Sequence, residues 1–174
     1  MTMTEQAPNK DHDENPVIRF SNGSDCLPQL RALTESGIRS IDIFSHYLNP
    51  IIFADEAFID AVISLIHYSP RSTVRILIRH TQMLHSSTAN SLLALTQRIP
   101  SKVKVRRYME GAKDPDMGFV CVDQKHLLYF NDESSFIGFS RRNAKAESRN
   151  VLDEFEHLWI YGSEEDPDLR ALCI

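Results

Sequence analysis

The amino-acid sequence predicts an α/β protein with a mixed β-sheet flanked by helices on both faces. Three observations support this fold class. Up to about residue 106, apolar strands alternate with amphipathic helices, which is typical of a largely parallel sheet with right-handed crossovers. From residue 118 onward, short strands joined by tight turns indicate an antiparallel meander. The composition, 42% hydrophobic and 25% charged over 174 residues, is typical of one globular domain.

The alternating part follows a polar tail. Residues 1–15 are predicted to be disordered, and residues 16–174 are predicted to form a single domain. The elements then expected in chain order are a strand at 17–20, a helix from Asp25 to Gly37, a strand at 38–44, a helix at 54–68, a strand at 73–78, a helix at 87–99 and a strand at 103–106. The helix at 54–68 has the clearest pattern, because its apolar residues fall on one broad face and Pro70 ends it.

The meander and one further helix complete the predicted domain. Short strands are expected at 119–122, 127–130 and 136–139, followed by a polar loop at 141–149. Apolar residues between Val151 and Trp159 then recur with helical spacing, and Gly162 is the expected end of that helix. Its apolar face is expected to pack on the sheet.

Composition limits the function classes. The net charge of −5 disfavours general affinity for nucleic acid, which depends on a basic surface, so we do not expect a nucleic-acid partner; a local basic patch is the alternative that stays open. The three cysteines are far apart and form no CxxC pair, which favours a reducing compartment. No apolar segment is long enough to span a membrane, and the polar N-terminus does not resemble a secretory signal. We therefore expect a cytosolic protein without a membrane partner.

Common catalytic and cofactor motifs are absent from the sequence. It contains no GxSxG elbow, no GxxxxGK(S/T) loop, no GxGxxG turn and no HExxH pair. The seven histidines are scattered, and His80 and His85 are five residues apart, which does not place both on one helical face. We therefore expect neither a cofactor nor a metal.

The order of segments is more informative than any single motif. Ile41–Pro50 (IDIFSHYLNP), Arg75–Arg79 (RILIR), Val103–Tyr108 (VKVRRY) and the meander from Gly118 follow one another as in the phospholipase D-like superfamily. The chain resembles one half of such a fold over roughly residues 25–162. In that family a His-x-Lys-x4-Asp motif carries the chemistry: the His is the nucleophile towards a phosphodiester and the Lys holds phosphate oxygens.

The resemblance implies a degenerate motif, as in a bacterial branch of the superfamily. The corresponding run is DMGFVCVD, so that if Asp123 is the Asp of the motif, Asp116 stands at the His position and Gly118 at the Lys position. Later family elements are loosely matched by Gly138–Ser140 and by Asn150. A carboxylate repels a phosphodiester and cannot form a phosphohistidine, and glycine supplies no cation. Activity by the family mechanism is therefore not expected.

A candidate ligand site is predicted at the carboxyl ends of the parallel strands, where ligands gather in α/β sheets. Arginine forks there suit a phosphate or another anion. The candidate ligand-binding residues are His46, Arg79, His80, Arg107, Asp116, Asp123 and Arg142, with Arg142 expected to approach from the meander. The alternative is a set of solvated charges paired with some of the acidic residues.

Two functions remain open on this evidence. The first is a non-catalytic ligand-binding or interaction module. The second is a hydrolase or transferase acting on a phosphate-containing substrate with rewired residues, for which His46, His80 and His126 are candidates. Active family members join two motif-bearing halves, and this chain has one, so a homodimer and a monomer both remain open.

Overall fold

The computed structural model describes residues 15–81, 84, 91–108 and 117–171. A seven-stranded sheet in the order β1-β7-β6-β5-β2-β3-β4 forms its centre. The strands are β1 (Ile18–Phe20), β2 (Ser40–Ser45), β3 (Thr73–Ile78), β4 (Val103–Arg107), β5 (Gly118–Val122), β6 (His126–Asp132) and β7 (Ile137–Arg141). The helices are α1 (Gly23–Glu35), α2 (Pro50–Phe53), α3 (Glu56–Tyr68), α4 (Ser91–Arg98), α5 (Lys145–Ile160) and α6 (Pro167–Ala171).

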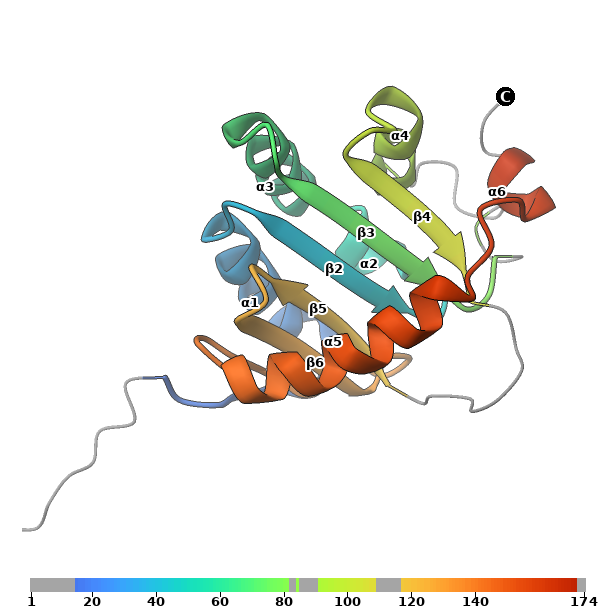
Figure 1. The fold of residues 1–174 in the computed structure, drawn as a ribbon. Coiled ribbons are helices and arrows are strands. Elements are labelled where there is room, and N and C mark those ends of the chain that lie inside the picture. Colours follow the sequence, from blue (N-terminus) through green and yellow to red (C-terminus); the bar gives the residue numbers. More distant parts are fainter. Residues whose placement is uncertain (1–14, 82–83, 85–90, 109–116, 172–174) are drawn as a thin grey trace, which may run out of the picture.

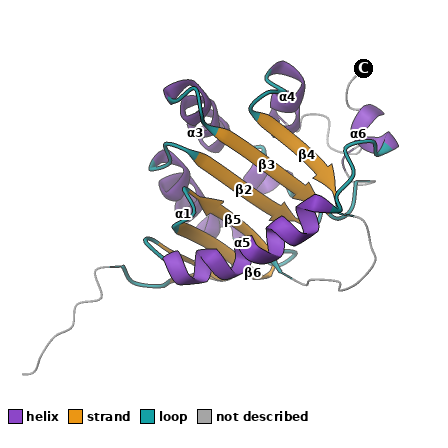
Figure 2. Ribbon diagram, in the orientation of Figure 1, coloured by secondary structure: helices purple, strands orange, loops and turns teal. Residues whose placement is uncertain are grey.

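The predicted fold class is confirmed: the sheet is mixed and carries helices on both faces (Figures 1 and 2). β2, β3 and β4 are parallel, and β5, β6 and β7 form the predicted antiparallel meander. β1 differs from the expected pattern, because it pairs antiparallel with β7 at the far edge instead of joining the parallel strands. The predicted tail, residues 1–15, lies outside the described residues except for Asn15.

The first layer of helices covers the back of the sheet as seen in Figure 1. Buried residues of α1, α3 and α4 pack there against β2, β3 and β5 in one apolar cluster that includes Leu30, Phe58, Leu92, Ile43 and Val120. Side-chain caps fix where two of these helices begin. Asn22 accepts a hydrogen bond from the Asp25 N–H at the start of α1, and Asp55 accepts one from the Phe58 N–H at the start of α3.

The second layer is α5, the only helix among the described residues that crosses the front of the sheet, which it does diagonally (Figure 1). A second apolar cluster joins this helix to the sheet, with Phe155 in edge-to-face contact with Phe119 and stacked on Trp159. Within the described residues, no helix is both long and apolar enough to cross a membrane.

Candidate functional site

The carboxyl ends of the parallel strands meet at one edge of the sheet. The register pairs Ile78 with Arg107, and the backbone N–H groups of Arg79 and His80 donate to the carbonyls of Ser45 and His46 at 3.1 and 2.7 Å. The structure therefore brings four candidate residues to the same edge: His46, Arg79, His80 and Arg107.

Acidic residues of the segment between α5 and α6 compensate part of the positive charge at this edge. Arg107 Nη1 donates to Asp166 Oδ2 at 2.7 Å, and Arg106 Nε donates to Glu164 Oε1 at 3.1 Å. Burial acts to raise the pKa of Asp166, but the hydrogen bonds from Arg107 and from two backbone N–H groups outweigh burial and lower it. The carboxylate is therefore ionised, and Arg107 has a fixed internal partner.

The remaining candidate residues do not join this group. Asp116 lies outside the described residues. Arg142 does not approach the strand ends as expected, because β7 ends at the opposite edge of the sheet, where Arg142 Nη2 donates to the Ala32 carbonyl at 3.0 Å. Asp123 also lies at that opposite edge, because β5 runs antiparallel to β2 and its last residue pairs with the start of β2.

Asp123 holds the backbone that leads into β2. Its carboxylate accepts hydrogen bonds from the N–H groups of Ile38, Arg39 and Ser40 at 3.0, 2.7 and 3.0 Å. Asp123 and Gln124 are the first two residues of the three-residue turn between β5 and β6, with positive φ angles of 53° and 58°. These contacts give Asp123 a structural role in the described part of the chain.

The sequence did not predict a buried polar cluster that lies at the carboxyl end of β2. The Glu133 side chain, from the turn between β6 and β7, accepts a hydrogen bond from the Ser45 hydroxyl at Oε1 and one from the His46 N–H at Oε2, the latter at 2.9 Å. The Ser45 oxygen also accepts from the Leu48 N–H at 2.8 Å. Burial raises the pKa of the Glu133 carboxyl, while the hydrogen bonds from Ser45 and His46 act to lower it.

Glu133 occupies the space over Gly118. A Cβ atom placed on Gly118 would lie 2.8 Å from Glu133 Oε2 and 3.4 Å from the Phe44 carbonyl oxygen. The signal that could have found this contact is the hairpin itself. The three-residue turn that begins at Asp123 pairs Gly118 with Phe130 and so returns the end of β6 to the beginning of β5.

The cluster offers little access for chemistry. Ser45 is fully buried, so its hydroxyl is not placed to attack a substrate in solution. His46 Nε2 is also buried and has no hydrogen-bond partner in the described part of the chain. His126, the third candidate histidine, lies at the other edge, where Nδ1 accepts from the Asn143 N–H and burial lowers its pKa. Among the described residues, no group of three His, Cys, Asp or Glu side chains could hold a metal ion.

The contact between Gly118 and Glu133 predicts how a substitution at position 118 changes the stability of the protein. Gly118→Ala should destabilise the protein by about 1 to 3 kcal/mol, because the new methyl group must displace a carboxylate held by two hydrogen bonds. In a Glu133→Ala background the same substitution should have a clearly smaller effect. Urea unfolding of the four proteins measures the difference, and an equal effect in both backgrounds would show that another neighbour limits position 118.

The comparisons with known proteins agree with the described fold. The family model "Domain of unknown function (DUF7931)" matches residues 23–172. No curated protein matches the chain. One similar solved structure is NucT from Helicobacter pylori, with a TM-score of 0.60 and 14% identity; the match covers 86% of this chain and 97% of that one. Another is Nuc from Salmonella typhimurium, a phospholipase D family member, with a TM-score of 0.56 and 16% identity; the match covers 86% of this chain and 95% of that one. The likeness to the phospholipase D-like superfamily is thus confirmed at the level of the fold.

A third similar structure corrects one expectation. TrmBL2, an archaeal chromatin protein described with a novel mode of DNA binding, has a TM-score of 0.62 and 11% identity over 90% of this chain, which spans 56% of that protein. The exclusion of nucleic acid as a partner was therefore wrong, because this fold also occurs in a DNA-binding chromatin protein. Net charge is an average over the chain, whereas binding depends on where the cations lie.

Proposed function

The chain belongs to the family described as domain of unknown function DUF7931, and we propose that it is a non-catalytic binding module of phospholipase D-like fold. Its ligand carries phosphate groups, the class of ligand that the fold neighbours favour. The module holds this ligand without cleaving it.

This proposal rests mainly on one observation: the Glu133 carboxylate lies over Gly118. By the sequence resemblance, this glycine stands where the superfamily keeps the lysine that holds phosphate oxygens. Glu133 Oε2 takes that space, and Glu133 is 2% exposed. An acidic side chain there supplies no positive charge for a phosphoryl group, and its ionised form would repel one. The family mechanism therefore lacks its electrostatic support at this edge.

One observation favours the second candidate, a hydrolase or transferase with rewired residues. Ser45, His46 and Glu133 contact one another at the carboxyl end of β2, the edge at which ligands of α/β sheets gather. The arrangement differs from a catalytic triad, because the Ser45 hydroxyl donates directly to the carboxylate and no hydrogen bond joins it to the His46 ring among the described residues. The full burial of Ser45 also favours a structural role.

An assay with a chromogenic phosphodiester separates the two functions. We expect hydrolysis by the purified full chain to be indistinguishable from the blank. Ser45→Ala and His80→Ala are the matched variants. Turnover clearly above the blank that either substitution abolishes would reject the non-catalytic module and establish the rewired enzyme. Turnover that both variants retain would point to a contaminating activity, and the proposal would stand.

A further inference from the structure

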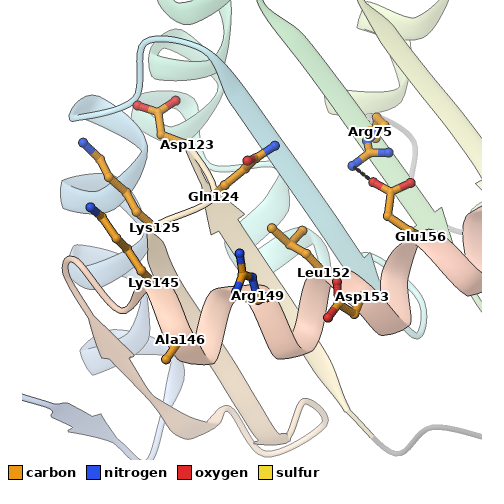
Figure 3. A pocket seen from close by; sticks show the side chains of 10 residues that line it. All are labelled: Arg75, Asp123, Gln124, Lys125, Lys145, Ala146, Arg149, Leu152, Asp153 and Glu156. Carbon is orange, nitrogen blue, oxygen red and sulfur yellow. Dashed lines mark ion pairs between the residues drawn. The ribbon is translucent and has the colours of Figure 1, made fainter.

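A polar groove lies on the front of the sheet, beside α5 (Figure 3). Because α5 is the only helix described on this face, the sheet beside it is left open. A cavity of about 740 Å³ lies there and adjoins a second one of about 420 Å³, since Arg75, Gln124 and Glu156 line both. We call the two together the front groove. It lies away from the strand ends at which Glu133 is buried.

Three cations are gathered at one end of the front groove. Lys145 and Arg149 are exposed and lie one turn apart on α5, and Lys125 is the last residue of the turn between β5 and β6 (Figure 3). None of the three has an ion-pair partner within the described residues. This end of the groove thus presents cationic side chains that the described structure leaves available to a ligand.

The acidic residues nearby are largely committed to other partners. The Asp123 carboxylate accepts three backbone hydrogen bonds. Glu156 and Asp42 both pair with Arg75, at 2.6 Å each. Asp153 is exposed and lies one turn after Arg149 on α5 (Figure 3). Both signs of charge therefore line the groove, and Lys104 also lies at the Arg75 end. What distinguishes the Lys125 end is that its cations have no ion-pair partner among the described residues, whereas Asp42 and Glu156 are paired with Arg75.

The turn residue Gln124 adds an independent observation. Its φ of 58° is one that glycine adopts freely. A left-handed conformation is less favourable for other residues by roughly 1 to 2 kcal/mol. The chain nevertheless has a glutamine here, whose exposed amide lines both parts of the front groove. Strained residues of this kind cluster where ligands bind.

We propose that the front groove binds the sugar–phosphate backbone of a nucleic acid through Lys125, Lys145 and Arg149, with the Gln124 amide as a further hydrogen-bonding group. The proposal rests on the proposed function, binding without cleavage. An open groove lined mainly by charged and polar side chains suits a polymer with repeated negative charges better than an apolar ligand. Side chains of this kind contact phosphates, so the binding is independent of base sequence.

Fluorescence anisotropy with labelled DNA of about 20 nucleotides, single-stranded and duplex, tests the proposal on the full chain. For three phosphate contacts on duplex, raising NaCl from about 50 to 200 mM should weaken binding about 40-fold. Lys145→Ala/Arg149→Ala should lower the slope of log affinity against log salt by about 2 and reduce affinity at least tenfold at the lower salt. The control Arg71→Ala/Arg98→Ala removes the same charge from exposed positions outside the groove and should change affinity less than about twofold.

The outcomes are distinguishable. The proposal that the front groove binds nucleic acid would be overturned if neither DNA bound at the lower salt. It would also be overturned if the two double variants lost equal amounts of DNA affinity. Binding to vesicles of phosphatidylglycerol and phosphatidylcholine in the absence of DNA binding would overturn it in favour of a membrane surface. A denaturing gel of the same DNA samples reports cleavage. Cleaved DNA contradicts the non-catalytic function, whereas intact, unbound DNA contradicts only the groove.

Discussion

Replacing Arg75 by alanine is expected to destabilise the protein by about 3 to 5 kcal/mol near pH 7, because it leaves a buried carboxylate without its partner. Arg75 Nε donates to Asp42 Oδ1 at 2.6 Å, and Asp42 is 1% exposed on β2, an inner strand of the sheet. The Arg75 guanidinium also lies over the rings of Phe155 and Trp159, at 4.9 and 5.6 Å from their centroids. Urea unfolding followed by circular dichroism measures the loss.

The loss should depend on pH. Burial raises the pKa of Asp42, and the hydrogen bond and charge of Arg75 act to lower it, so the Arg75→Ala variant should have a still higher Asp42 pKa. An acid whose pKa is higher in the folded state contributes stability below its unfolded pKa and loses it as pH rises through the folded value. The loss of stability caused by Arg75→Ala should therefore be smaller near pH 5 than near pH 7.

The double variant Asp42→Asn/Arg75→Ala serves as the control, because it removes the buried charge together with its partner. It should recover part of the stability near pH 7 and lose most of the additional pH dependence. A deficit of equal size at both pH values would show that Asp42 remains well solvated without Arg75, and that the loss reflects packing on the two aromatic rings.

Phe155→Ala is expected to destabilise the protein by about 3 to 5 kcal/mol as well, through the cavity that the lost ring leaves. Phe155 is fully buried, with ring centroids 5.9 Å from Phe119 and 5.5 Å from Trp159. Leu152→Ala, at a half-buried position one turn earlier, is the matched control and should have a clearly smaller effect. Similar losses for the two variants in urea unfolding would show that the contact of α5 with the sheet is not centred on Phe155.

Local patterns in the sequence predicted much of the fold. The helix expected at 54–68 corresponds to α3, Glu56–Tyr68, because its apolar period is strong and its end is marked by a proline. The final helix was predicted only from Val151, whereas α5 begins at Lys145. Its first turns are mostly polar and show no apolar period. Those turns supply Lys145 and Arg149, two of the three cations of the front groove.

The candidate site was harder to predict, because it depends on contacts between distant segments. The strand-end residues His46, Arg79, His80 and Arg107 meet at one edge because parallel strands end together, a rule that holds for α/β sheets in general. Arg142 was misplaced because its location depends on the direction of each strand in the meander. Glu133 lies beyond a β6 whose pairing with β7 contains a register shift, which no local pattern reveals.

The placement of β1 has a consequence for the order of folding. The hairpins of β5, β6 and β7 join neighbours in sequence and need only short loops to close. β1 has three residues, and Ile18 pairs with Ser140, so nearly the whole domain separates this strand from its partner. Pairings between such distant segments form slowly. During synthesis, residues 18–20 must therefore wait until β7 has been made, and the closure of the sheet at β1 is a late event in the maturation of the protein.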